Sequence, residues 1–193
     1  MTSVNIYIFL FDGFSDWEIS YLTPELQKSE KINLKYFTID GLEITSVGGL
    51  KITPDLSIKE LSLDNPIVLV LPGGSAWEEK SINGIDELVE TLYSKNQTIA
   101  AICSATTFLG QKGYLDDIKH TSNALEYLKY IAPEYKGDKY YQSDLTVSDK
   151  NIITANGFSP IEFSREIFTK IELHSHEDIE KWFQLFKNGI WSE

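Results

Sequence analysis

The sequence predicts an α/β domain in which helices cover both faces of a mainly parallel sheet. Short apolar runs rich in β-branched and aromatic residues recur about every 30 residues, with helical patterns between them. Strands that alternate with helices are typical of βαβ units, whose parallel strands are buried on both faces. A length of 193 residues suits one such domain, and we expect a single domain over residues 1–193.

Four apolar runs are predicted to be strands of this sheet, because each is short and ends at turn residues. They span residues 5–11, 34–39, 66–74 and 98–103. Helices are predicted from the apolar periodicity of residues 16–30, 82–96, 104–115, 159–173 and 176–191. Pro160 and Gly189 stand where a helix typically starts and stops.

Two other segments are predicted to be β-hairpins. In residues 43–55, two short alternating runs flank Gly48 and Gly49. In residues 145–156, the turn is expected at Asp149 and Lys150.

The composition limits the classes of binding partner and the cellular compartment that we expect for this protein. Acidic residues number 29 against 17 basic ones, and the net charge of -12 repels nucleic acid and anionic membranes while favouring solubility. A single cysteine cannot form an internal disulfide, and the N-terminus lacks the basic region of a signal peptide. We therefore expect a cytoplasmic protein with a small-molecule substrate, no nucleic-acid or membrane partner, no cofactor and no metal site.

Cys103 is the first candidate functional residue. It stands in AAICSATTFLG, between an apolar strand and a helical pattern, so the chain must turn at or beside it. This arrangement is typical of a nucleophile elbow, which places the sulfur at the carboxyl end of the sheet and at a helix N-terminus. Both features favour the thiolate, so we expect the pKa of Cys103 to fall below the free value of about 8.5. The alternative is an inert core cysteine.

Two more segments of the sequence lie where predicted strands end, at the same edge of the sheet as Cys103. Gly73 and Gly74 close the run PIVLVLPGG, where glycines let backbone N–H groups approach a ligand and hold an oxyanion, although such a pair is also common in loops. Glu18 follows the first strand in DGFSDWE and is expected in the first helical turn, at the same carboxyl end of the sheet. The alternative interpretation is that Glu18 is a surface acid that stabilises a helix N-terminus.

Together, LPGG, AICSA and the glutamate of DGFSDWE resemble the ThiJ/PfpI superfamily, which includes the parkinsonism-associated deglycase. The segments GYLDDIKHTSN and NIITANGFSPIEFSREI resemble two further motifs of that family. The resemblance implies a flavodoxin-like three-layer sandwich of the glutamine amidotransferase type, and a homodimer.

The resemblance also implies roles for individual residues. Cys103 matches the nucleophile, and Glu18 matches the carboxyl group that hydrogen-bonds its sulfur. Gly73, Gly74 and Ser104 match the backbone amides of an oxyanion or oxidised-cysteine site. Asn123 falls where several members have a histidine that lines the pocket.

The sequence departs from the family at both of its histidine positions. Ser104 replaces the histidine that follows the cysteine in members described as proteases, and Asn123 replaces the pocket histidine. His120 is expected to face away from Asn123, and His174 and His176 are expected in a solvated capping region. No general base for the thiol is therefore evident.

The sequence supports three hypotheses for function. The first is a cysteine-dependent enzyme that acts on a small electrophilic carbonyl compound, for which hydrolase, glyoxalase, deglycase and, by family label only, protease are the names in use. The second is a redox-sensing or stress-response protein in which Cys103 oxidises to the sulfinate without turnover. The third is a binding or chaperone module, which a large exposed apolar patch would support.

Overall fold

The computed structural model describes residues 3–64 and 66–191, and a mostly parallel sheet forms its centre. Within these residues the sheet has seven strands in the order β5-β2-β1-β6-β7-β9-β8, and only the β8–β9 pair is antiparallel. The strands are β1 (Val4–Phe9), β2 (Ile32–Thr38), β5 (Leu56–Ser57), β6 (Ile67–Leu71), β7 (Thr98–Ile102), β8 (Thr146–Asp149) and β9 (Ile152–Ala155).

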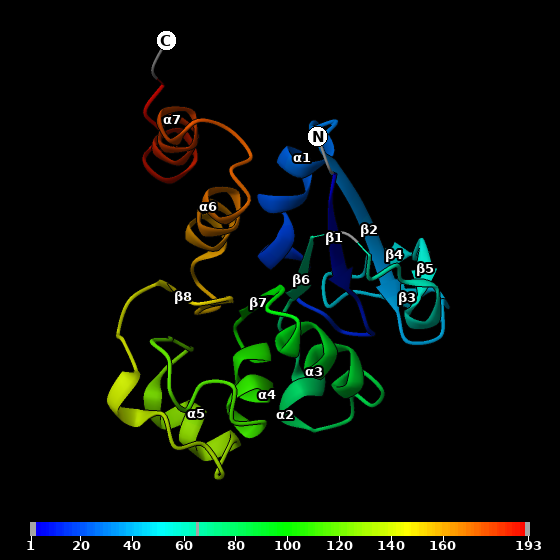
Figure 1. Ribbon diagram of the computed structural model, residues 1–193, viewed down its shortest axis with the longest axis vertical. Coiled ribbons are helices and arrows are strands. Elements are labelled where there is room, and N and C mark those ends of the chain that lie inside the picture. The colour runs from blue at the N-terminus through cyan, green and yellow to red at the C-terminus, as the bar shows by residue number, and fades with distance from the viewer. Residues whose placement is uncertain (1–2, 65, 192–193) are drawn as a thin grey trace.

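Helices cover both faces of the sheet (Figure 1). One layer holds α1 (Leu22–Gln27), α6 (Pro160–Lys170) and α7 (His176–Asn188). The other layer holds α2 (Ser75–Glu78), α3 (Asp86–Ser94), α4 (Ala105–Gln111) and α5 (Leu125–Ile131). Three short 3₁₀ helices lie in the connections: η1 (Asp16–Ile19), η2 (Ile58–Glu60) and η3 (Asp138–Tyr140). The fold is the predicted flavodoxin-like α/β sandwich.

The predicted strands and hairpins are confirmed with small changes at their ends. The first hairpin consists of β3 (Ile44–Thr45) and β4 (Lys51–Ile52), which pair antiparallel around the two glycines. The second consists of β8 and β9, and Lys150 adopts a positive φ of 51° at its turn. Every residue of β6 is buried, as expected for a strand between two helical layers.

Three predicted helices are wrong in extent, and one of them, predicted over residues 104–115, ends at Gln111. The pattern at 16–30 forms η1 and α1, with a break at Ser20 and Tyr21. Pro24 has no N–H to donate to the Ser20 carbonyl, so one continuous helix is disfavoured. The helix predicted from residue 82 begins at Asp86, because Gly84 adopts a φ of 89° that a right-handed helix does not allow.

The topology brings several strand ends to one edge of the sheet. The chain runs outward from β1 in one direction through β2 and in the other through β6 and β7, so the strand order reverses between β1 and β6. Such a switch point is where open α/β sheets place their sites. In the described part of the chain, no helix is long and apolar enough to cross a membrane.

Candidate functional site

Cys103 occupies a strained turn between β7 and α4. Its φ is 60°, in the left-handed region that non-glycine residues adopt only at a cost of about 1 kcal/mol or more. The turn is fixed from both sides, because the Cys103 N–H donates to the Ala155 carbonyl at 2.9 Å and its own carbonyl accepts from Thr106 at 3.1 Å. The predicted strand–turn–helix elbow is confirmed, and it lifts the sulfur out of the sheet.

Two glycines allow the backbone to pack directly against this cysteine. A Cβ atom at Gly73 would lie 2.7 Å from the Cys103 Cβ, and one at Gly157 would lie 2.8 Å from the Cys103 Sγ. Both distances are too short for real carbon contacts, so a side chain at either position would displace the cysteine. Gly157 was not singled out as a site residue from the sequence, although it lies in the segment NIITANGFSPIEFSREI that resembles a family motif.

Glu18 lies on η1 and is completely buried against the elbow. Its Oε2 accepts a hydrogen bond from the Gly73 N–H at 2.6 Å, which joins residues 55 positions apart. Among the described residues, its buried Oε1 accepts no N–H or O–H group, and the Cys103 thiol is the further neighbour that hydrogen-bonds this carboxyl group. The glutamate is therefore part of the Cys103 site and not a surface acid of a helix N-terminus.

Burial sets the protonation of the Glu18–Cys103 pair. It raises the pKa of Glu18 to about 7, although hydrogen bonds with Gly73 and Cys103 act in the opposite direction. It also raises the pKa of the Cys103 thiol to about 11, and the nearby charge of Glu18 adds to this effect. The expected depression of the Cys103 pKa is therefore wrong, because loss of solvation outweighs the helix N-terminus.

The pair has a chemical consequence at neutral pH. Between the two pKa values it holds one proton and one negative charge. A glutamate with a pKa near 7 is suited to accept a proton from the thiol and to return it. Glu18 is therefore a candidate for the general base that was not evident from the sequence.

The backbone amides of the two predicted glycines are already occupied. The Gly73 N–H donates to Glu18, and the Gly74 N–H donates to the Ser104 hydroxyl at 2.8 Å. That hydroxyl in turn donates to the Gly74 carbonyl at 2.9 Å, so Ser104 bridges the elbow and the start of α2. Among the three predicted amides, the Ser104 N–H is the one that bonds the sulfur, and this bond opposes the rise in the Cys103 pKa.

The Asn123 side chain also approaches the sulfur. Its Nδ2 lies 3.4 Å from the Cys103 Sγ, and its Oδ1 accepts the Gly157 N–H at 2.9 Å. His120 does not reach the site, because it is buried between the Ile118 carbonyl and the Tyr135 hydroxyl. The expectation that His120 and Asn123 diverge is confirmed.

Three further side chains near the site were not predicted. Trp17, which is half exposed, points its indole N–H at the Gly157 carbonyl over a distance of 3.5 Å. The Tyr127 hydroxyl donates to Glu78 Oε1 at 2.6 Å, and the phenol is close enough to Cys103 for their charges to interact. These contacts join segments far apart in the chain, and no local motif marks them.

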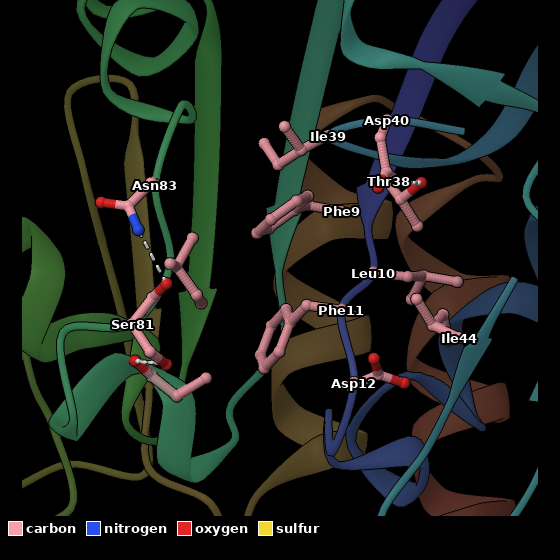
Figure 2. Close-up of a pocket in the computed structure, with 12 residues that line it drawn as sticks. Phe9, Leu10, Phe11, Asp12, Thr38, Ile39, Asp40, Ile44, Ser81 and Asn83 are labelled. Carbon is pink, nitrogen blue, oxygen red and sulfur yellow. Dashed lines mark hydrogen bonds between the residues drawn. The ribbon is translucent and has the colours of Figure 1, made fainter. Parts of the chain in front are cut away.

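A separate groove lies beside the site. It has a volume of about 400 Å³ and is lined by the ends of β1 and β2 and by residues 76–83 (Figure 2). Neither Cys103 nor Glu18 lines it, and its carboxylates, Asp12 and Asp40, accept backbone N–H groups. In the described residues, no group of three or more His, Cys, Asp or Glu side chains is arranged to hold a metal ion.

Comparison with known proteins agrees with this architecture. The profile of the DJ-1/PfpI family matches residues 4–170. YoaZ of Bacillus subtilis, named an uncharacterized protease, is 38% identical over 97% of this chain and 92% of its own length. A protein of Pyrococcus abyssi named a deglycase is 29% identical over 62% of this chain and 72% of its own length. The crystal structure of a thiJ/pfpI family protein from Bacillus anthracis has a TM-score of 0.90 at 36% identity, covering 98% of this chain and 93% of that one.

The fold and the site define an α/β protein with a cysteine at a nucleophile elbow beside a buried glutamate. The chain belongs to the DJ-1/PfpI family. The resemblance drawn from its motifs is thereby confirmed. The family includes proteins named as deglycases and as proteases.

Proposed function

We propose that this chain is a cysteine-dependent enzyme that acts on small electrophilic carbonyl compounds, such as aldehydes and ketoaldehydes. The observation that carries the proposal is the pairing of Cys103, in a strained elbow, with the fully buried Glu18. A core cysteine needs neither an unfavourable φ nor a buried carboxyl group beside it. The deglycase name of one relative is in line with carbonyl chemistry.

In the proposed reaction, the Glu18 carboxylate accepts the thiol proton while the Cys103 sulfur attacks the carbonyl carbon. A carbon–sulfur bond forms, and the π electrons of the carbonyl move onto its oxygen. The Ser104 N–H and the Asn123 amide, which both bond the sulfur, are placed to stabilise the oxygen charge. Glu18 then returns the proton to this oxygen and leaves a neutral hemithioacetal, from which hydrolase, glyoxalase and deglycase chemistry all begin.

General proteolysis is not part of the proposal. Ser104, at the position where protease-labelled members carry histidine, is engaged with both backbone groups of Gly74. It is therefore unable to activate the thiol.

The decisive experiment is a panel of small aldehydes and ketoaldehydes, with casein as a further substrate, assayed on wild type and Cys103→Ser. We expect the wild-type protein to consume at least one aldehyde that Cys103→Ser does not consume. We expect no cleavage of casein that depends on Cys103. Absence of aldehyde turnover across the panel would overturn the enzyme proposal. Casein cleavage that disappears in Cys103→Ser would overturn the exclusion of proteolysis.

A redox role is the second candidate, and the donors around the sulfur favour it. The Asn123 amide and the Ser104 N–H are placed to hold oxygen atoms added to Cys103, and the chain has no second cysteine to form an internal disulfide. Each equivalent of peroxide would add one oxygen to the sulfur and release water. Intact mass under graded peroxide should pause at two added oxygens in wild type, and Glu18→Leu should not show this pause. Identical curves for the two proteins would contradict this role for Glu18.

A further inference from the structure

The hydroxyl of Thr106 lies between the Cys103 elbow and the segment that carries Asn123. It donates to the Cys103 carbonyl at 2.6 Å, and its oxygen lies 2.6 Å from the oxygen of the Ser122 hydroxyl. Both hydroxyl-bearing residues are buried away from water, where a polar group is costly unless it is hydrogen-bonded. Thr106 therefore joins the start of α4 to the segment at residues 120–123.

The directions of these two hydrogen bonds follow from the number of protons. A threonine hydroxyl has one proton, and Thr106 gives it to the Cys103 carbonyl, which is only an acceptor. The Ser122 hydroxyl must then be the donor in the second bond, and the Thr106 oxygen is the acceptor. The hydrogen bonds run in one direction, from Ser122 through Thr106 to the backbone of Cys103.

Ser122 directly precedes Asn123, whose amide nitrogen lies 3.4 Å from the Cys103 sulfur. The same segment is attached to the sheet on its other side, because the Thr121 N–H donates to the Thr154 hydroxyl on β9 at 2.8 Å. One buried hydroxyl thus holds both partners of the contact at the sulfur. It holds Cys103 through its carbonyl, and it holds Asn123 through the residue that precedes it.

Thr107, the next residue of α4, shows which of these bonds is unusual. Its buried hydroxyl donates to the Ser104 carbonyl at 2.6 Å, just as Thr106 donates to the carbonyl three residues before it. Such bonds to a nearby carbonyl are an ordinary local pattern of threonine. The contact with Ser122 is the feature that Thr106 has in addition.

We propose that Thr106 is a positioning residue that holds the Asn123 amide at the Cys103 sulfur through its hydrogen bond with Ser122. The inference rests on the proposed role of Cys103 as a nucleophile. Without the Thr106 hydroxyl, Ser122 loses its acceptor and the Cys103 carbonyl loses one donor. The segment is then less firmly held against α4, and the hydrogen bond from Asn123 to the sulfur becomes weaker.

The test is the rate at which iodoacetamide alkylates Cys103 between pH 6 and pH 10. Cys103 is the only cysteine in the chain, so intact mass reports a single event. The variants are Thr106→Val, which has nearly the same shape without the hydroxyl, and Thr106→Ser, which keeps the hydroxyl. Thr107→Val is the matched control. The titratable groups that interact with the sulfur, Glu18 on η1 and Tyr127 on α5, are present in every variant.

We expect Thr106→Val to alkylate about two- to tenfold more slowly at pH 8, the equivalent of one hydrogen bond, and its pH profile to move upward. Thr106→Ser should retain more of the rate, and Thr107→Val should match wild type. Ser122→Ala removes the same bond from its other end and should slow alkylation as Thr106→Val does. Thermal melts of all the variants verify that they are folded, and Ser122→Ala carries the test if Thr106→Val does not fold.

A double-mutant cycle with Asn123→Ala separates positioning from a direct effect on the elbow. If Thr106 acts through Asn123, Thr106→Val will slow alkylation in the wild-type background and not in the Asn123→Ala background. Equal effects in both backgrounds, no effect in either, or equal slowing by Thr107→Val would overturn the proposal. Alkylation requires no substrate turnover, so a failed aldehyde panel would refute the enzyme proposal and leave this test intact.

Discussion

At the scale of single residues, the site depends on one proton shared between Cys103 and Glu18. Both groups are held away from water, which raises both pKa values. The charge of Glu18 makes ionisation of the thiol still less favourable, whereas the hydrogen bond with Cys103 favours the Glu18 carboxylate. The helix N-terminus beside the sulfur does not reverse this balance. A cysteine at an elbow is therefore not always a thiolate, because a neighbouring glutamate can raise the pKa of the thiol.

The first prediction concerns the thiol. The alkylation rate of wild type should still be rising at pH 9, because burial and Glu18 raise the pKa of Cys103 to about 11. Glu18→Gln removes the neighbouring charge and should move the profile to lower pH by about one pH unit or more. Glu43→Gln, at an exposed position, is the matched control and should follow wild type. A wild-type plateau below the free-thiol value of about 8.5 would contradict this account.

The second prediction concerns stability. The pKa of Glu18 rises from 4.5 in the unfolded chain to about 7 in the fold, so the folded state binds more protons between these values. Its contribution to stability is present below pH 4.5 and is lost as the pH rises through 7. The loss corresponds to about 3 kcal/mol in the free energy of unfolding.

Glu18→Gln does not titrate at this position, so it should gain about 2 to 3 kcal/mol relative to wild type between pH 5 and pH 8. Urea unfolding of both proteins at the two pH values measures this difference. Glu43→Gln again serves as the control. A constant difference between Glu18→Gln and wild type across the range would show that Glu18 titrates normally in the fold.

At the scale of elements, the junction between β7 and α4 stores conformational strain. Cys103 pairs through its backbone with the strand and helix on either side, and these bonds hold its φ at 60°. Strain of this kind persists only where the surroundings fix it, and it is common at functional sites. The elbow thus lowers stability to hold the sulfur above the sheet.

The third prediction tests that strain by comparing two substitutions that both remove the sulfur. Cys103→Gly should be about 1 kcal/mol more stable than Cys103→Ala, because glycine adopts a positive φ without strain. In the control pair, Ala105→Gly at the buried first residue of α4 should lose about 1 kcal/mol, because it removes a buried methyl group and frees the unfolded backbone. Chemical denaturation at one pH ranks the four proteins. If Cys103→Gly is the less stable of the first pair, the elbow is not strained.

Much of this architecture follows from local sequence, and the site follows only in part. Strands and hairpins were predictable because each depends on apolar spacing and turn residues over a few positions. The elbow was predictable for the same reason, since a buried strand meets a helix at Cys103. The break before α1 was missed because the apolar pattern continues across it while Pro24 prevents a helix.

The contacts around the sulfur were less accessible to sequence reasoning. For example, the Gly74 N–H donates to the Ser104 hydroxyl. This hydrogen bond depends on the packing of two loops that are 30 positions apart in the chain. The approach of Gly157 and the pairing of Tyr127 with Glu78 likewise depend on packing between layers. Similarity to a family indicates which positions belong to the site, but it does not predict which hydrogen bonds the residues at those positions form.

At the scale of the whole molecule, charge determines which electrophiles reach the cysteine. The net charge is -12, and the acid beside the sulfur is Glu18. Among the described residues, Glu18 is the charged group that acts on the pKa of Cys103, and no cation contributes to it. A negative field lowers the local concentration of anions and favours neutral or cationic reagents.

The fourth prediction compares iodoacetamide, which is neutral, with iodoacetate, which is an anion of similar size and chemistry. The ratio of their rates at Cys103 should exceed the ratio for free cysteine, and should fall as salt screens charges beyond about 10 Å at 0.1 M. Glu18→Gln should lower the ratio, since it removes the charge that acts on Cys103, whereas Glu79→Gln, at the exposed residue that follows α2, should change it less. Both reagents attack the same sulfur, so differences in thiol pKa cancel in the ratio. A ratio equal to that of free cysteine at every salt concentration would show that the protein's charge does not reach the site, and anionic carbonyl compounds would then belong in the substrate panel on equal terms.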